Sequence, residues 1–90
     1  MVVQGNHDIS NSDGDALGVY VSARLPRAYL SVIGGSHEGP FLGDGPQPTT
    51  VRAATVAWLD LTVRHQSDAL DRLRAFGHVP GSTNLNDEGF

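Results

Sequence analysis

The fold is decided by one stretch of the chain, Val32-Ile33-Gly34-Gly35-Ser36-His37-Glu38-Gly39-Pro40-Phe41. Its apolar start is typical of a buried strand, and two glycines then place His37 at the mouth of a loop rich in Gly and Pro. Imidazole titrates near neutrality, and glycine lets another group approach the backbone closely. His37 is therefore a candidate for proton exchange with a bound substrate, and a loop histidine without a function is the alternative.

A second stretch, Val2-Val3-Gln4-Gly5-Asn6-His7-Asp8, has the same design, with a carboxylate at its end. In open parallel sheets, ligands bind beyond the carboxyl ends of the strands. A histidine base also needs a carboxylate on its second nitrogen, which fixes the tautomer and stabilises the imidazolium. We therefore expect Asp8 and His37 to be two members of a catalytic set whose third member, a nucleophile, lies outside this chain.

Composition limits the protein class. Ninety residues make one small domain, and the absence of cysteine excludes a disulfide framework and a thiolate metal site. A net charge of −4 without a basic run argues against nucleic-acid binding. No apolar stretch approaches the roughly 20 residues of a membrane span. We expect neither a cofactor nor a metal site, apart from the metal-dependent alternative discussed below. The amino terminus lacks the features of a secretory signal, but a signal could lie upstream, so cytoplasmic and secreted locations both stay open.

The order of elements predicts an α/β fold. Strands are expected over residues 1–5 and 28–33, and a helix capped by Ser12 or Asp13 should run between them to about residue 24. This βαβ unit predicts parallel strands. A long Gly/Pro-rich loop follows, over residues 34–48. We expect a largely apolar helix from Thr49 or Thr50 to about residue 65, and a short helix capped by Ser67 and ended by Gly77.

The sequence predicts different structures at the two ends of the chain. The apolar start at Met1 reads as the second half of a buried strand, so we expect the chain to be the carboxyl-terminal part of a larger protein. The residues after Gly77 are polar and rich in Gly and Asn, and residues 82–90 are expected to form a loose tail. Two parallel strands and three helices should leave a strand edge and an apolar face bare.

Three segments resemble parts of the α/β-hydrolase family. Gln4–Asp8 is similar to the Gly-x-x-Asp turn that carries the acid, and Arg27–His37 is similar to the last strand and its histidine. Val56–Asp60 is similar to the closing helix. The resemblance covers residues 1–81 and is greatest to cutinase-like, dienelactone-hydrolase-like and chlorophyllase-like serine esterases. It implies the carboxyl-terminal βαβ-α-α portion of that fold, an incomplete three-layer sandwich.

The resemblance also implies an activity, the hydrolysis of carboxylic esters through an acyl-enzyme. The family orders its triad as Ser, Asp or Glu, then His, which makes Asp8 the acid and His37 the base. The family's Gly-x-Ser-x-Gly nucleophile has no counterpart here, so the serine is expected upstream. The partner would be a small-molecule or polymeric ester. The chain by itself is then expected to be inactive.

Two residues near His37 need separate interpretation. Ser36 lies in Gly-Gly-Ser-His-Glu, one residue short of a nucleophile motif, but a long loop follows instead of a helix. We interpret Ser36 as a loop hydroxyl that bonds nearby backbone. Phe41 is a candidate substrate-binding residue that lines an acyl or aromatic pocket, and packing onto the following helix is the alternative.

Two other functions stay open. Gly5-Asn6-His7-Asp8 matches the Gly-Asn-His-Asp/Glu block of calcineurin-like metallophosphoesterases, in which Asn6 and His7 would serve a two-metal site. Against this, Gly35-Ser36-His37 does not match the Gly-His-x-His block of that family. The chain could also be a binding remnant without turnover, because an acid–histidine pair without a nucleophile cannot form an acyl-enzyme.

Overall fold

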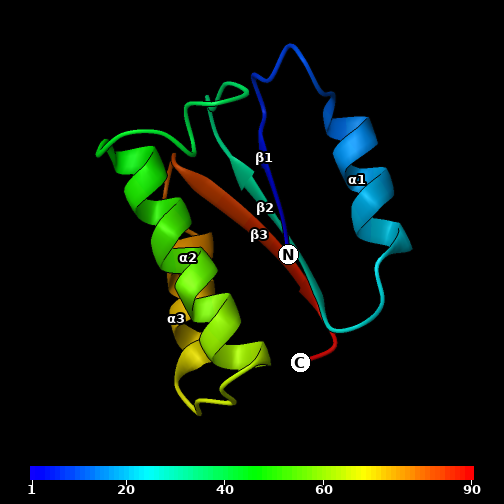
Figure 1. The fold of residues 1–90 in the computed structure, drawn as a ribbon, viewed down its shortest axis with the longest axis vertical. Coiled ribbons are helices and arrows are strands. Elements are labelled where there is room, and N and C mark those ends of the chain that lie inside the picture. The colour runs from blue at the N-terminus through cyan, green and yellow to red at the C-terminus, as the bar shows by residue number, and fades with distance from the viewer.

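The computed structural model describes residues 1–90 and contains three strands and three helices (Figure 1). The elements are, in chain order, β1 (Val2–Gly5), α1 (Asp13–Ser22), β2 (Arg27–Val32), α2 (Pro46–Thr62), α3 (Ala69–Gly77) and β3 (Thr83–Glu88). The α/β class, the βαβ start and the two following helices are confirmed. None of the helices combines the length and apolarity needed to cross a membrane.

The sheet is mixed, with strand order β1-β2-β3. β1 and β2 are parallel, as predicted, and Val2 pairs with Tyr29. β2 and β3 are antiparallel, and Leu30 pairs with Leu85. The prediction that the sheet contains only parallel strands was therefore wrong, because β3 runs antiparallel to β2.

The prediction of a loose tail over residues 82–90 was also wrong, because β3 occupies most of it. Thr83 and Leu85 are buried, whereas the alternate residues Asn84 and Asn86 are exposed. This alternation is that of a strand with one face on the core. The Thr83 hydroxyl further donates to the Phe76 carbonyl at 2.7 Å and so ties the start of β3 to the end of α3.

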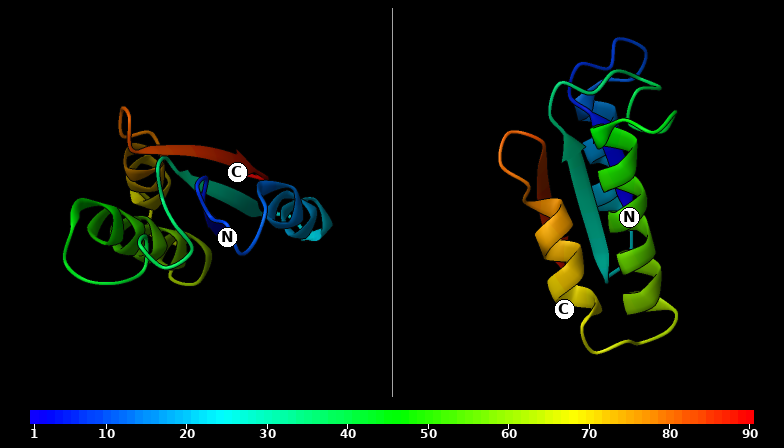
Figure 2. Two further views of the ribbon diagram at one scale, coloured as in Figure 1. Left: turned by 90° about the horizontal axis from the view of Figure 1, so that it is seen from above. Right: turned by 90° about the vertical axis from the view of Figure 1, so that its left-hand side faces the viewer.

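Helices cover both faces of the sheet. Leu30 and its neighbours on one face pack against α2 and α3, whereas Tyr29 on the other face packs against Tyr20 of α1. The right panel of Figure 2 shows α2 and α3 in front of the sheet and α1 behind it. The larger core cluster consists of Ala28, Leu30, Val32, Val51, Ala54, Ala57, Leu73 and Leu85.

Helix boundaries differ from the expected ones for local reasons. Ser12 is the cap of α1, since its hydroxyl accepts from the Asp15 amide at 3.1 Å. α2 begins at Pro46 rather than at Thr49, because proline needs no amide partner in a first helical turn. It ends at Thr62, before the expected residue 65. α3 begins at Ala69 with Asp68, not Ser67, in the capping position.

The expected bare strand edge is present, but the expectation of a bare sheet face was wrong, because α1 lies on one face and α2 and α3 on the other. β1 is an outer strand and pairs only with β2. The side chains of Val56 and Leu59 on α2, and of Val63 directly after its end, are exposed, while Val51 and Ala54 are buried.

Candidate active site

The structure brings Asp8 and His37 together. Both follow strands whose carboxyl ends meet at one edge of the sheet, β1 for Asp8 and β2 for His37. His37 Nδ1 lies 2.9 Å from Asp8 Oδ2, within hydrogen-bond distance. The expectation that the two side chains meet at this edge is confirmed, and their catalytic roles remain a prediction.

The Asp8 carboxylate is enclosed by donors, and its side chain is only 5% exposed. Oδ1 accepts from the backbone amides of Ser10 at 2.7 Å and Asn11 at 2.9 Å. Oδ2 accepts from the Gln4 side-chain amide at 3.2 Å and also faces His37. Burial alone would raise the pKa of Asp8, but the hydrogen bonds from Asn11, His37 and Ser10 outweigh it and lower that pKa from 3.8 to about 2. The carboxylate is therefore ionised at neutral pH.

The hydrogen bond to Asp8 fixes the tautomer of His37. An ionised carboxylate only accepts hydrogen bonds, so Nδ1 must carry the hydrogen. In the neutral ring, Nε2 then holds the free lone pair, and no hydrogen-bond partner occupies it. The His37 side chain is 48% exposed. This arrangement gives a proton acceptor that faces outward, with a fixed negative charge behind it to stabilise the imidazolium.

The two loops are locked together through their backbones. The His7 amide donates to the Gly35 carbonyl at 2.9 Å, and the Gly34 amide donates to Asn6 Oδ1 at 2.7 Å. A Cβ atom at Gly5 would lie 2.3 Å from the Gly35 carbonyl oxygen, so only glycine allows this approach. The contact sets the position of the Asp8 loop relative to the His37 loop.

Ser36 does not act on His37. Its hydroxyl oxygen accepts from the Gly39 amide at 3.0 Å, which confirms that it is a loop hydroxyl bonded to nearby backbone. No serine, threonine or tyrosine hydroxyl of residues 1–90 is hydrogen-bonded to the His37 ring.

Phe41 lies on the loop that follows His37 and is 50% exposed. It lines a hollow of about 310 Å³ with Pro40 and four residues of α2, namely Val51, Arg52, Thr55 and Val56. Its neighbour Pro40 is fully buried and would meet a Cβ atom placed on Gly35. The hollow therefore adjoins the backbone that carries His37, although Asp8 and His37 do not line it.

Asn6 and His7, the residues of the metal-site hypothesis, are not arranged as metal ligands. Asn6 uses its side-chain oxygen to hold the Gly34 amide, and His7 is exposed without a side-chain partner. No three His, Cys, Asp or Glu side chains lie in an arrangement that could hold a metal ion.

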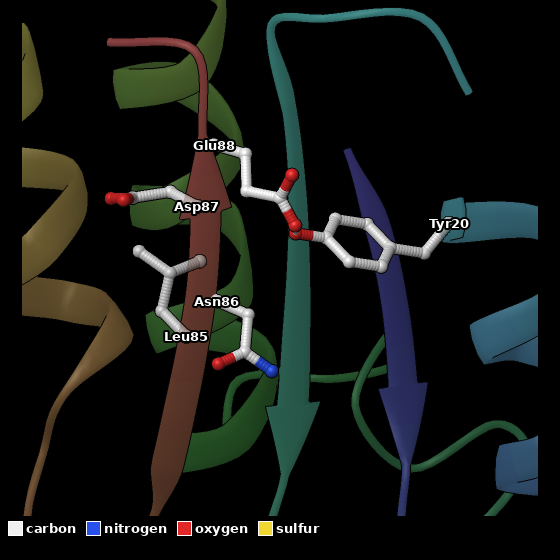
Figure 3. Close-up of a pocket in the computed structure, with 5 residues that line it drawn as sticks. All are labelled: Tyr20, Leu85, Asn86, Asp87 and Glu88. Atoms are coloured by element: carbon white, nitrogen blue, oxygen red, sulfur yellow. Dashed lines mark hydrogen bonds between the residues drawn. The ribbon is translucent and has the colours of Figure 1, made fainter. Parts of the chain in front are cut away.

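A second hollow, of about 370 Å³, lies on the sheet face that α1 partly covers. Figure 3 shows Tyr20 reaching from α1 toward Glu88 at the end of β3. The Tyr20 hydroxyl donates to Glu88 Oε1 at 2.8 Å, and Arg27 pairs with the other oxygen at 2.9 Å. The bonds from Tyr20 and Arg27 lower the pKa of Glu88, and burial raises that of Tyr20. This cluster joins α1 to the carboxyl-terminal strand.

Gln4 was not predicted as a site residue, but its buried side chain contacts Asp8. The sequence does contain one indication of its role, a side-chain amide in an otherwise apolar strand. A buried polar group requires hydrogen-bond partners, so such an amide is expected to contact other polar groups.

Comparisons with protein-family models, with curated proteins and with solved structures find no match to this chain.

Proposed function

We propose that Asp8 and His37 are the acid and base of a serine ester hydrolase of the α/β-hydrolase type, whose nucleophilic serine comes from sequence outside residues 1–90. The observation that carries the proposal is the 2.9 Å contact between His37 Nδ1 and Asp8 Oδ2, which leaves Nε2 free. The resemblance of both strand ends to that family supports it. The absence of a hydroxyl bonded to His37 in this chain is the reason to place the serine elsewhere.

The chemistry follows from this geometry. His37 Nε2 takes the proton of the serine hydroxyl as the serine oxygen bonds to the ester carbonyl carbon. The imidazolium, stabilised by Asp8, then gives this proton to the departing alkoxide, which leaves as an alcohol. Water attacks the acyl-serine while His37 takes a proton from it as the base, and His37 then gives this proton to the serine oxygen as the carbon–oxygen bond breaks and the carboxylic acid is released. Asp8 stays ionised throughout, in keeping with its low pKa of about 2.

The hollow beside Phe41 supports a preference for esters with an apolar group. Phe41, Val51 and Val56 supply its apolar lining, and Arg52 supplies its one charge. An acyl or aromatic group of the ester would bury apolar surface here, with a gain of about 25 cal/mol per Å². Phe41 is thus the substrate-binding residue of the proposal.

The test is hydrolysis of p-nitrophenyl butyrate by the longest polypeptide that the gene encodes around residues 1–90. His37→Ala and Asp8→Asn should each lower kcat by about 10⁴-fold, because they remove the base and its tautomer control. His78→Ala is the matched control, since His78 is exposed at the end of α3, and it should leave kcat unchanged. Residues 1–90 alone should show no hydrolysis that depends on His37.

A second substrate separates the proposal from the metal hypothesis. Hydrolysis of p-nitrophenyl phosphate that is lost with a chelator, together with no His37-dependent ester hydrolysis, would contradict the esterase and favour the phosphoesterase.

A further inference from the structure

Gln4 is the one polar side chain of β1, and it is buried at 7% exposure. Its side-chain nitrogen lies within hydrogen-bond distance of three oxygens. These are Asp8 Oδ2 at 3.2 Å, the Asn11 carbonyl at 2.9 Å and its neighbouring Gly5 carbonyl at 3.2 Å. All three oxygens are acceptors, so the chemistry fixes the direction of the amide. With the amide reversed, its own oxygen would face a carboxylate and two carbonyls.

The partners of Gln4 span the whole turn that carries the acid. Asp8 opens this turn and Asn11 closes it, and Asp8 Oδ1 already holds the Ser10 and Asn11 amides. The Gln4 side-chain amide donates to the other carboxylate oxygen, Asp8 Oδ2, and to the Asn11 carbonyl. Gln4 thereby links β1 to both ends of this turn.

The same oxygen that Gln4 holds is the one that meets His37. His37 comes from a different strand, so its alignment with Asp8 depends on how firmly that oxygen is placed. We infer that Gln4 is a positioning residue of the Asp8–His37 pair, which aims Asp8 Oδ2 at His37 Nδ1. The inference rests on the proposed function for its meaning in catalysis, and on the structure alone for its geometry.

The first experiment reads the His37 tautomer of residues 1–90 from ¹⁵N chemical shifts, at a pH at which the ring is neutral. Wild type should be mainly the Nδ1–H form, because Asp8 only accepts. Gln4→Met keeps the length of the side chain and removes its donors. It should lower the Nδ1–H population toward that of free imidazole. Gln66→Met is the control, since Gln66 contacts Arg72 between α2 and α3 and should leave the tautomer unchanged.

A second measurement uses wild type only, in case Gln4→Met does not fold. The two side-chain hydrogens of Gln4 should exchange with water more slowly than those of Gln66, whose side-chain nitrogen donates no hydrogen bond. An unchanged tautomer in folded Gln4→Met would overturn the inference. So would exchange at Gln4 as fast as at Gln66.

Kinetics of the longer polypeptide separate this inference from the proposed function. Gln4→Met should lower kcat by about ten- to a hundred-fold with KM nearly constant, as expected when a catalytic group is misplaced by up to about 1 Å. If no ester is hydrolysed but the tautomer still responds to Gln4→Met, the esterase proposal fails and the positioning role stands. If esters are hydrolysed and Gln4→Met changes neither kcat nor the tautomer, the positioning role fails.

Discussion

Replacement of Gly5 by alanine tests the contact that holds the two site loops together. The added methyl group would lie 2.3 Å from the Gly35 carbonyl oxygen, 2.5 Å from its carbon and 2.6 Å from the Ser36 carbonyl oxygen. All three are backbone atoms, which cannot rotate away as a side chain does. Ordinary contact begins near 3.4 Å, so the loops must part by about 1 Å.

The expected loss of stability has two sources. Forcing a methyl group into a packed site costs about 1–3 kcal/mol. Parting the loops also breaks the 2.9 Å hydrogen bond from the His7 amide to the Gly35 carbonyl, which adds about 1 kcal/mol. Gly5→Ala should therefore lower the free energy of unfolding by about 2–4 kcal/mol, a large share of the total for a small domain.

Urea unfolding followed by circular dichroism measures this change. Gly18→Ala is the matched control, because no atom outside the local backbone of α1 lies within 4 Å of a Cβ placed there. Removal of a helical glycine should stabilise the protein by about 0.5–1 kcal/mol. A free energy of unfolding of Gly5→Ala within about 0.5 kcal/mol of the wild-type value would contradict this prediction. Such a result would mean that the loops adapt and that their contact does not set the site.

Two further predictions concern acid stability and the final strand. The pKa of Asp8 is lower in the folded chain than its ordinary 3.8, so the unfolded chain binds this proton first and stability is lost as the pH falls from about 4 toward 2. Asp8→Asn should flatten that part of the pH profile of urea midpoints, and an unchanged slope would contradict the low pKa. Leu85→Ala should cost about 2–5 kcal/mol of unfolding free energy, because Leu85 is buried in the core. Asn86→Ala, on the exposed face of β3, should cost less than about 0.5 kcal/mol, and equal effects would argue against the strand.

Much of the architecture can be predicted from local sequence patterns. The runs before Gly5 and Gly34 are read as strands because apolar residues recur in them over a short length, and the helix between them makes the strands parallel. Polar groups at the ends of such strands then meet at one edge, which is why Asp8 and His37 could be paired from the sequence.

The final strand could not be read in the same way. Thr83–Glu88 contains Asn, Asp and Glu, which are depleted in strands, and only Leu85 among its inward residues is strongly apolar. Its structure comes from the open edge of β2 and from the core, where Leu85 packs with Leu30 and Leu73. Such pairing depends on distant residues, so the composition of the segment alone misleads.

Gln4 was missed for a different reason. Its partners are close in sequence, but they converge only when the turn from Asp8 to Asn11 folds back on β1. The apolar residues of β1 predict that the strand is buried, but they do not predict which groups the Gln4 side-chain amide contacts.

The most direct test of the proposed function is covalent labelling with a fluorophosphonate, which reacts with an activated serine. The probe is applied to the longest polypeptide that the gene encodes around residues 1–90, and the labelled residue is located by mass spectrometry. We predict one labelled serine outside residues 1–90, with labelling lost in His37→Ala and retained in His78→Ala. No labelling at all, a label on a serine within residues 1–90, or equal labelling of the His37→Ala variant would contradict it.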